Sequence, residues 1–341
     1  MNDIKSMTRE ELTALLTAAG FPRFRADQLY GHLARGIAAF EDIPNLPKAL
    51  IEWLREHTHL SSFQIVNKYV SALDGTVKYL VELDDKARVE CVVMDYKHGL
   101  SVCLSTQVGC RMGCAFCAST IGGRERDMTA GEIRDQYLFL TKDMGRRIDS
   151  IVLMGMGEPL DNYDNVLRFI RLINDEKGVN LSTRHIALST CGLTPRIYDL
   201  AKEKLGIALA VSLHAPNDDM RRQIMPVAHT YPIDGLIAAC AHYEALTGRR
   251  ITFEYTLIKG FNDSPACAKE LIALLKPLKN RHVNLISVNP VEGREFERCT
   301  KEDIFAFQKL LSAGQINATV RRTMGSDISG SCGQLKRKER S

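Results

Sequence analysis

Residues 100–117 read LSVCLSTQVGCRMGCAFC, a β-like run that leads directly into three closely spaced cysteines. The apolar residues of Leu100–Leu104 predict a buried strand. Cys110, Cys114 and Cys117 then fall within one short loop. Three thiolates in such a loop can bind three irons of a 4Fe–4S cluster and leave the fourth iron without a protein ligand. The stretch therefore predicts a strand that presents an iron–sulfur cluster with one open iron, which a bidentate small molecule could occupy.

From residue 100 onward the sequence alternates between β-like and helical patterns, which is typical of βα units. The strand candidates are Leu100–Leu104, Ser150–Met154, His185–Ser189, Ile207–Leu213, Ile251–Leu257 and His282–Val288. Ile316–Arg322 is a candidate for a final strand. Six units are too few for a closed eight-stranded barrel. We therefore predict an α/β fold with a partial six-stranded (βα)6 barrel that is open on one side for a large substrate.

The chain before the barrel changes character twice. Residues 1–60 carry three helical patterns, of which the first begins with a capping box at Thr8, and they predict a small helical accessory domain. Residues 61–98 hold three β-like runs separated by turns, and they predict a short antiparallel β region. The barrel domain is expected over 99–325 and a separate C-terminal segment over 326–341. Basic residues occupy polar positions of the helical module, namely Lys5, Arg9, Arg23, Arg25 and Arg35.

Composition is that of an ordinary globular protein. Of the 341 residues 45% are hydrophobic and 25% are charged, and the formal net charge of +4 permits a nucleic-acid partner without demanding one. No apolar run approaches the length of a membrane span, and the charged start MNDIKSMTREEL does not resemble a signal peptide. A cytoplasmic protein without a membrane partner is predicted. In that reducing compartment ten cysteines do not indicate a disulfide framework.

Polar or glycine-rich residues follow several of the predicted strands. In a βα barrel the functional loops lie at these carboxyl ends, so the residues are expected to share one rim. Gly157 lets the backbone approach a ligand closely, and the carboxylate of Glu158 can accept a hydrogen bond from an ammonium group. Four such loops at one rim are hard to explain by packing alone. The positions in question are Gly157, Glu158, Ser189, Ser212, Leu213, His214 and Asn289.

Other interpretations of the cysteine loop are weaker. A structural zinc site usually takes four ligands, often from two C-x-x-C pairs, and no second pair exists here, although His98 could contribute. A ferredoxin-type cluster would need a fourth nearby cysteine. The C-x3-C-x2-C spacing after a strand, in a βα domain, is similar to the signature of the radical S-adenosylmethionine (SAM) superfamily. With the rim loops, the chain resembles the RlmN/Cfr family of that superfamily over nearly its whole length.

The resemblance implies a 4Fe–4S cluster held by Cys110, Cys114 and Cys117, and SAM as both methyl donor and radical source. It implies that SAM is contacted by the rim residues Gly157, Glu158, Ser189, Ser212, Leu213, His214 and Asn289. The family pattern also assigns roles to two further cysteines and one carboxylate. Cys332 corresponds to a cysteine that becomes methylated, Cys103 to one that later forms a transient disulfide with it, and Glu90 to a proton acceptor.

From the residues alone, a buried core thiol is the favoured interpretation of Cys103, and an exposed strand carboxylate remains an open interpretation of Glu90. Cys332 differs, because it lies in a stretch of glycine and serine with little to pack, which could swing a thiol into an active site. The chain has Gly330-Ser331 before this cysteine, where the family usually has two alanines. Since all these residues are small, we expect only a looser loop.

The implied function is methylation of carbon 2 of an adenosine in 23S rRNA and of an adenosine beside the tRNA anticodon. An external electron donor of flavodoxin or ferredoxin type is implied, and a monomer is expected. The main alternative is the Cfr-type activity on carbon 8, although the Gly-Glu-Pro and His-Ala-Pro-Asn loops favour carbon 2. A non-catalytic iron–sulfur RNA-binding protein and an electron-transfer protein remain weaker alternatives. Candidate phosphate contacts are the arginines at 111, 124, 126, 221, 222, 249, 250, 321 and 322, with a basic tail at 336–340 that is expected to be mobile.

Overall fold

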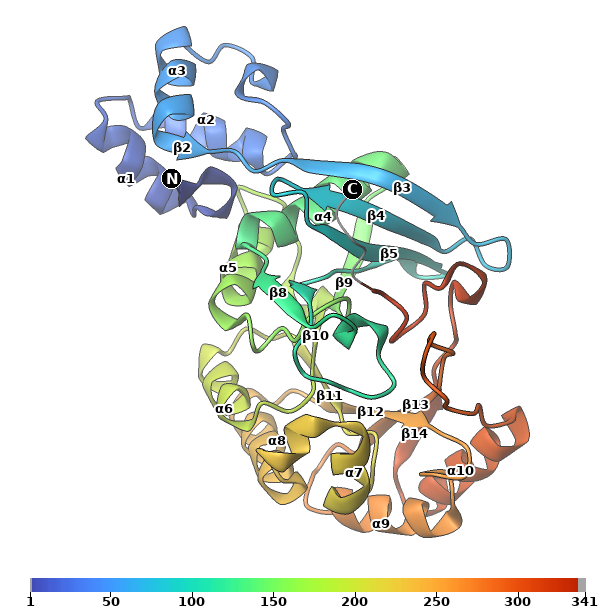
Figure 1. The fold of residues 1–341 in the computed structure, drawn as a ribbon. Helices are drawn as coiled ribbons and strands as arrows, with labels where there is room; N and C mark the ends of the chain where they lie inside the picture. The colour runs from blue at the N-terminus through green and yellow to red at the C-terminus, as the bar shows by residue number, and fades with distance from the viewer. Residues whose placement is uncertain (1, 337–341) are drawn as a thin grey trace.

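Ten strands form one continuous sheet that runs through the whole molecule (Figure 1). The structure is a computed structural model that describes residues 2–336. The strand order is β14-β13-β12-β11-β10-β9-β6-β5-β4-β3, and the strands from β6 to β14 are parallel. Their bounds are β6 Gly99–Cys103, β9 Ile148–Leu153, β10 Ile186–Thr190, β11 Ala208–Ser212, β12 Ile251–Leu257, β13 His282–Ser287 and β14 Asn317–Val320. The predicted α/β fold and its final strand are therefore confirmed.

The antiparallel strands belong to the same sheet as the parallel ones. They are β3 Phe63–Val70, β4 Val77–Leu83 and β5 Arg88–Tyr96, and β5 pairs with β6 at the edge of the parallel series. Two short pairs were not predicted, since their strands have two to four residues and little apolar pattern. These pairs are β1 Asn2–Asp3 with β2 Thr58–His59, and β7 Gln107–Gly109 with β8 Arg124–Asp127.

Helices cover the outer face of the parallel strands, and three further helices form the N-terminal module (Figure 1). Capping boxes at Thr8 and Thr129 begin α1 and α4, as their sequences predict. The helices are α1 Arg9–Ala18, α2 Phe24–Leu33, α3 Lys48–His57, α4 Ala130–Met144, α5 Tyr163–Asn174, α6 Thr194–Glu203, α7 Asp218–Ile224, α8 Ile233–Thr247, α9 Pro265–Leu275 and α10 Lys301–Ala313. Short 3-10 turns are η1 Ile4–Ser6, η2 Phe40–Asp42, η3 Ala118–Thr120, η4 Thr183–His185, η5 Pro226–His229 and η6 Ser326–Ile328.

Alternation along the parallel strands gives the barrel an apolar outside and a polar inside. On β12 the side chains of Phe253 and Tyr255 are fully buried in the main hydrophobic core, and Tyr255 stacks on Phe307 of α10. The residue between them, Glu254, lines the interior cavity. Register partners continue this polar row across the neighbouring strands, at Ser212, Asn284 and Thr319. The interior is therefore suited to a polar ligand.

The N-terminal module is attached to the barrel by buried polar contacts. The ammonium group of Lys5 donates to Asp135 Oδ2 of α4 and to the carbonyl of Ser61, both at 2.7 Å. The side chains of Lys5 and Asp135 are only 1% exposed. The expectation that Lys5 occupies a polar surface position is therefore wrong: this lysine is part of the module's attachment and is unavailable to RNA.

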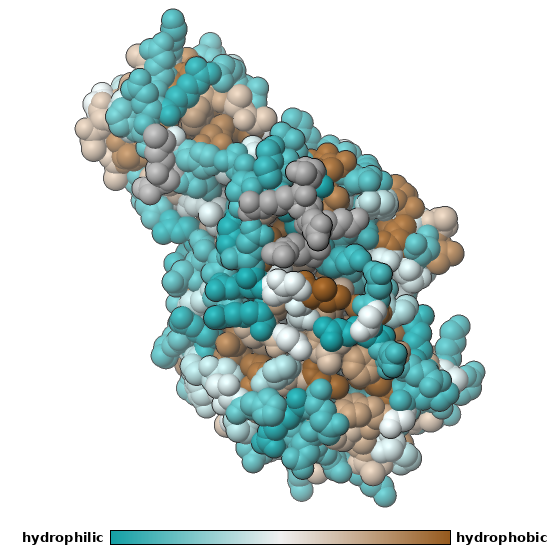
Figure 2. Space-filling view, in the orientation of Figure 1, coloured by the Kyte–Doolittle hydropathy of each residue, from teal (hydrophilic) through white to brown (hydrophobic). Residues whose placement is uncertain are grey.

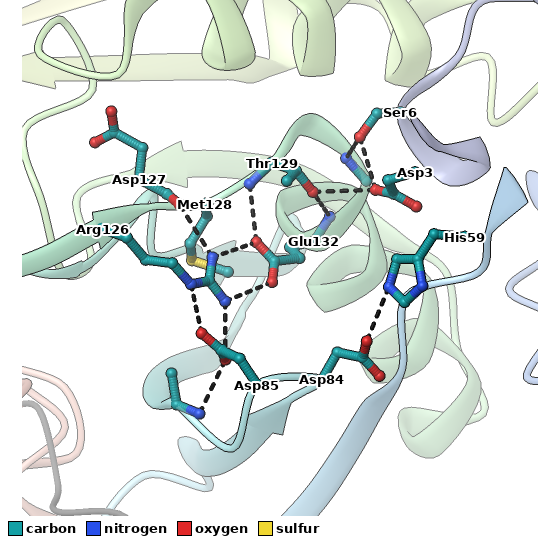
Figure 3. Close-up of polar contacts among 12 residues, drawn as sticks. Asp3, Ser6, His59, Asp84, Asp85, Arg126, Asp127, Met128, Thr129 and Glu132 are labelled. Atoms are coloured by element: carbon teal, nitrogen blue, oxygen red, sulfur yellow. Dashed lines mark hydrogen bonds and ion pairs between the residues drawn. The ribbon is translucent and has the colours of Figure 1, made fainter. Parts of the chain in front are cut away.

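Arg126 of β8 is the centre of a second polar junction (Figure 3). Its guanidinium donates to both carboxylate oxygens of Asp85, in the turn between β4 and β5, at 2.7 and 3.0 Å. It also donates to both oxygens of Glu132 in the capping box of α4, at 2.8 and 2.7 Å. A nearby ion pair joins His59 to Asp84 at 2.8 Å. Since both acidic partners occupy its donors, Arg126 is a structural residue, which corrects its placement among the phosphate contacts.

We expect the Arg126→Met variant to lower the free energy of unfolding by about 2 kcal/mol, because Glu132 is 6% exposed and would lose its charged partner. Chemical denaturation measures this change. The matched control is Arg146→Met, which removes an exposed pair with Asp95 and should cost no more than about 0.5 kcal/mol. Equal effects in the two variants would contradict the assignment of a structural junction to Arg126.

Hydrophilic residues cover most of the face shown in Figure 2, while hydrophobic residues gather along β3 and the hairpin tip that follows it. The exposed apolar side chains there include Ile65, Val66, Val70 and Leu73. Across residues 2–336 the structure contains no helix whose length and apolar character would suit it to a bilayer.

Candidate active site

The three cysteines of the loop after β7 line one open cavity at the carboxyl ends of the parallel strands. The space between its walls is about 940 Å³. Gly109 begins the loop at a φ of +77°, and a Cβ there would lie 2.0 Å from the carbonyl oxygen of Gly123. Only glycine fits that position. The amide of Ala115 donates to the carbonyl of Ile224 at 2.8 Å, so α7 supports the loop from behind.

The donor set of this loop fits an iron–sulfur cluster. Cys110, Cys114 and Cys117 all border the cavity, and Phe116 lines it beside them. Burial raises the pKa of the Cys110 thiol to about 12 and that of Cys114 well above its ordinary value, so positively charged irons are needed to hold them as thiolates. In the described part of the chain no three His, Cys, Asp or Glu side chains are arranged to hold a single metal ion. The alternative ligand His98 stacks instead on Tyr96.

The structure brings the predicted rim residues together, with one exception. The side chain of Leu213 is fully buried in the core and does not line the cavity, and its amide donates to the carbonyl of Glu254 at 3.1 Å. The residues that do line the cavity are Gly157, Glu158, Ser189, Ser212, His214 and Asn289.

Glu158 is held in place by backbone amides. Its carboxylate accepts from the amides of Cys191 at 2.7 Å and of Leu160 at 3.0 Å, and its own amide donates to Gln107 Oε1 at 2.8 Å. Burial raises the pKa of this carboxyl, and the amide of Cys191 is the largest opposing influence. Gln107 is a residue that sequence reasoning missed. Its side chain also donates to Asp127 and Asp161, so it joins the two sides of the cluster loop.

His214 is a buried, neutral imidazole. Its Nδ1 accepts from the amide of Thr256 at 2.9 Å, and Phe116 packs edge-on against the ring at 4.7 Å. Burial, assisted by the nearby charge of Arg221, lowers the pKa of His214 to about 3. The residue has a φ of +57°, in the left-handed region that asparagine also tolerates.

The depressed pKa of His214 predicts a pH dependence of stability. Unfolded His214 binds a proton near pH 6.5 whereas the folded residue does so near pH 3, so stability present at pH 7 is lost as the pH falls. The loss from this residue between pH 7 and pH 5 is about 2 kcal/mol. In urea titrations, His214→Asn should show a correspondingly smaller loss over this interval. The exposed His185→Asn control should keep the wild-type dependence, and a wild-type slope in both variants would refute the prediction.

Cys332 is exposed and lies on the wall between this cavity and a second one of about 680 Å³. Its carbonyl accepts from Asn289 Nδ2 at 3.0 Å, and the next carbonyl, of Gly333, accepts from the amide of Ala118 at 2.7 Å. Asn289 therefore holds the cysteine segment, in addition to lining both cavities. These contacts could not be foreseen from the sequence, because 43 residues separate Asn289 from Cys332.

The hairpin between β3 and β4 holds the same segment from the other side. Asp327 accepts from Ser71 Oγ at 2.6 Å and from the amide of Ala72 at 2.9 Å. The amide of Gly325 donates to Asp74 Oδ2 at 3.0 Å. In Figure 1 the C-terminal segment, drawn in red, lies against the tip of this hairpin. The loop that carries Cys332 is thus pinned both to the hairpin and to the cluster loop.

Cys103, at the end of β6, lines the second cavity together with Cys332. Burial raises the pKa of Cys103 to about 12, Cys332 adds to this increase, and Arg321 opposes it. Arg321, which lines both cavities, contacts Glu254 Oε2 at 3.5 Å. Arg321 was predicted as a phosphate contact, but its ion pair with Glu254 places it inside the site.

Glu90 lies under the C-terminal segment, outside the residues that line the two cavities. One carboxylate oxygen accepts from the amide of Lys336 at 3.1 Å, and the other is 3.3 Å from the ammonium group of Lys78. The side chain is 1% exposed, so the alternative interpretation of an exposed strand carboxylate is excluded.

Other predicted phosphate contacts also have partners within the protein, among them Arg124, which pairs with Asp127, and Arg222, which pairs with Asp218 and Asp219. Arg221 is fully buried, which makes contact with RNA impossible, so its prediction is wrong. Arg111 is more than half exposed but forms an ion pair with Asp161. Of the predicted basic tail at 336–340, residues 337–340 lie outside the described residues, whereas Lys336 donates its amide to Glu90 and pairs with Glu292.

A parallel βα barrel with a three-cysteine loop at its rim defines the class of radical SAM enzymes. The family model of the radical SAM superfamily matches residues 104–288. Such enzymes use a 4Fe–4S cluster and SAM, and these are the cofactors of this chain.

Similar proteins narrow this class to one family. A probable dual-specificity RNA methyltransferase RlmN of Lachnospira eligens is 48% identical over 339 residues, 99% of this chain and 97% of its own. One from Alkaliphilus oremlandii is 51% identical over 98% of each chain. A crystal structure of a radical SAM methyltransferase from Sphaerobacter thermophilus superposes with a TM-score of 0.93 at 43% identity, covering 98% of this chain and 99% of that one. The chain belongs to the RlmN family of dual-specificity RNA methyltransferases.

Proposed function

We propose that this enzyme methylates carbon 2 of an adenosine in 23S rRNA and of an adenosine beside the tRNA anticodon, through a methylated Cys332. The observation that carries the proposal is the position of Cys332 on the wall shared by the two cavities. One cavity holds the cluster loop and the rim residues, and we assign it to SAM. The other holds Cys103, and we assign it to the target base, which must be extruded from its RNA stack to reach it.

In this proposal Cys110, Cys114 and Cys117 hold the cluster, and Gly157, Glu158, Ser189, Ser212, His214 and Asn289 surround SAM. Leu213 supports this wall through its backbone. A 4Fe–4S cluster held by these cysteines would supply the single electron needed for reductive cleavage of SAM. Phe116, Met225 and Val288 contribute apolar side chains to the lining of this cavity, which would limit the contact of a reactive species with water.

The chain's own chemistry begins and ends at Cys332. Its thiolate forms a bond to the methyl carbon of one SAM as the sulfonium–carbon bond breaks, so both charges are neutralised. Loss of a hydrogen atom from this methyl group leaves a carbon radical on Cys332. This carbon then adds to the electron-poor carbon of the adenine ring. Glu90, directly or through a water, is the proposed acceptor of the ring proton. In this proposal the amide of Lys336, which donates to its carboxylate in the structure, moves away before the base reaches Glu90.

Cys103 completes the reaction by attacking the sulfur of Cys332. The new S–S bond forms as the bond between that sulfur and the methyl-derived carbon breaks. That carbon leaves with the bonding electron pair and takes a proton, which completes the methyl group of the released RNA. Burial disfavours the reacting thiolate of Cys103, whereas the neighbouring Arg321 favours it. An external reductant then reopens the disulfide.

The proposed organisation assigns RNA binding to the helical domain at 1–60 and to exposed arginines around the rim. The antiparallel region at 61–98 and the barrel at 99–325 form the body of the enzyme, while 326–341 carries the methyl carrier. We also propose a monomer, a flavodoxin- or ferredoxin-like electron donor and a cytoplasmic location. A Cfr-type reaction at carbon 8 is the second candidate, because the same two cysteines serve it.

The test uses enzyme with its cluster reconstituted anaerobically, together with SAM, a reductant and unmodified 23S rRNA or tRNA. Digestion and mass spectrometry identify the methyladenosines. We expect 2-methyladenosine from both RNAs with wild type and none with Cys114→Ala, which should lack the cluster. Formation of 8-methyladenosine would replace the proposal by the Cfr-type activity. SAM cleavage without any methylated nucleoside would refute the RNA substrates while leaving the cofactors in place.

A further inference from the structure

Arg221 of α7 is a fully buried arginine behind the cluster loop. Its Nη2 donates to the carbonyl of Cys191 at 2.6 Å and to that of Ser212 at 3.1 Å. Its Nε donates to the carbonyl of Leu213 at 3.1 Å. These carbonyls follow β10 and β11, and the side chains of Cys191 and Ser212 line the cluster cavity. The guanidinium is therefore fixed just outside the wall of that cavity.

This guanidinium has no ion-pair partner within residues 2–336. Its three hydrogen-bond partners are neutral carbonyls, and no carboxylate there lies within ion-pair distance of it. Burial lowers the pKa of Arg221, and the carboxylate of Asp218, at the start of the same helix, opposes this only from beyond that distance. The remaining nitrogen, Nη1, is buried and has no hydrogen-bond partner in the described structure. A buried charge without a partner is costly, since desolvation is not offset by attraction to an anion. Within the described residues, the fold therefore leaves Arg221 without an ion-paired anion.

The nearest candidates for that anion are on the cluster side. The helix that carries Arg221 also supports the cluster loop, because the carbonyl of Ile224 accepts from the amide of Ala115. Cys114 packs in the same buried cluster as Ile224 and Met225, at the end of this helix. Arg221 is therefore fixed on the element that packs directly against the cluster loop.

We propose that Arg221 is the buried counter-charge of the iron–sulfur cluster and raises its reduction potential. The inference rests on the assignment of Cys110, Cys114 and Cys117 as ligands in the proposed function. Reduction adds one electron, taken from the external donor, and makes the cluster more negative. A fixed positive charge stabilises that reduced form more than the oxidised form.

The test measures the reduction potential of the cluster directly. Wild type, Arg221→Met, Arg221→Gln and Arg221→Lys are reconstituted, checked for four irons per chain, and titrated anaerobically with redox mediators. The electron paramagnetic resonance signal of the reduced cluster is followed without SAM or RNA. The matched control is Arg222→Met, because Arg222 is the next residue but forms ion pairs with Asp218 and Asp219 on the surface.

We expect the two neutral variants to have a more negative potential than wild type, by several times any change in Arg222→Met. Arg221→Lys keeps the charge and should stay close to wild type. An unchanged potential in the neutral variants, or a lysine variant as negative as they are, would overturn the proposal. If the neutral variants fail to load the cluster, loading by Arg221→Lys still supports a need for charge. If Arg221→Lys also fails to load the cluster, the role of Arg221 is limited to its hydrogen bonds to the three carbonyls, and the inference is refuted.

A separate result would show that the ligand assignment, and not this inference, is at fault. Cys114→Ala should lose the four-iron cluster. If it instead reconstitutes with four irons and the wild-type signal, then the ligands proposed above are incorrect, whatever the Arg221 variants do.

Discussion

The Cys332→Ala variant should lose RNA methylation by roughly a thousandfold or more, because the proposed methyl carrier has no substitute within the site. Alanine removes the only atom that can accept a methyl group from SAM at this position. The cluster loop and the rim residues are untouched, so SAM cleavage by the reduced enzyme should continue. Liquid chromatography of 5′-deoxyadenosine and mass spectrometry of the digested RNA measure the two outcomes on one sample.

The control is Cys267→Ala, which removes a buried cysteine of α9 outside both cavities. It should retain methylation near the wild-type rate. A second readout is the mass of the tryptic peptide that contains position 332 after incubation with SAM, which should increase by one methyl group in wild type only. Continued RNA methylation by Cys332→Ala would show that the methyl group reaches the base without this carrier.

The Cys103→Ala variant should abolish multiple turnover and trap RNA on the protein. Cys103 and Cys332 border the same cavity, so the loss of one thiol removes the proposed route that frees the RNA from the other. Denaturing gel electrophoresis should show an RNA–protein species that survives heat and detergent. Nuclease digestion should leave an adenosine-containing mass on the peptide that carries Cys332.

Two controls separate trapping from misfolding. The double variant Cys103→Ala with Cys332→Ala should form no covalent species, because the carrier sulfur is missing. Cys91→Ala changes a neighbouring buried thiol of β5 that does not line either cavity, and it should turn over normally. Normal multiple turnover by Cys103→Ala would exclude the disulfide step.

The parts of the fold and the site that could be predicted are those encoded locally. The strands were foreseen because apolar β-branched runs recur between helical patterns, and β12 has the predicted bounds Ile251–Leu257. The cluster loop was foreseen because all three thiols lie within eight residues. The roles of Cys103, Cys332 and Glu90 came from family resemblance. The sequence alone favoured a core thiol for Cys103 and left an exposed carboxylate open for Glu90.

The failures involve charged residues with partners far away in sequence. Lys5 forms an ion pair with Asp135, which lies 130 positions later in the sequence. Arg126 reaches Asp85 across 41 positions, and Arg221 bonds carbonyls of two other loops. Lysine and arginine are usually exposed, so a sequence gives no sign that a particular one is buried. The short strands β7 and β8 were missed for a related reason, because their pairing rather than their composition defines them.

The double attachment of the Cys332 loop affects which reductant can reset the enzyme. The thiol of Cys332 is held in place by the Asp327 contacts and by Asn289. Its effective concentration at Cys103 is therefore far above that of a small thiol in solution. When a monothiol opens the disulfide, the released cysteine lies next to the mixed disulfide. It attacks that mixed disulfide and forms the bond between Cys103 and Cys332 again. A dithiol protein resolves this by completing its own disulfide. We therefore expect thioredoxin-like reductants to sustain turnover where glutathione does not.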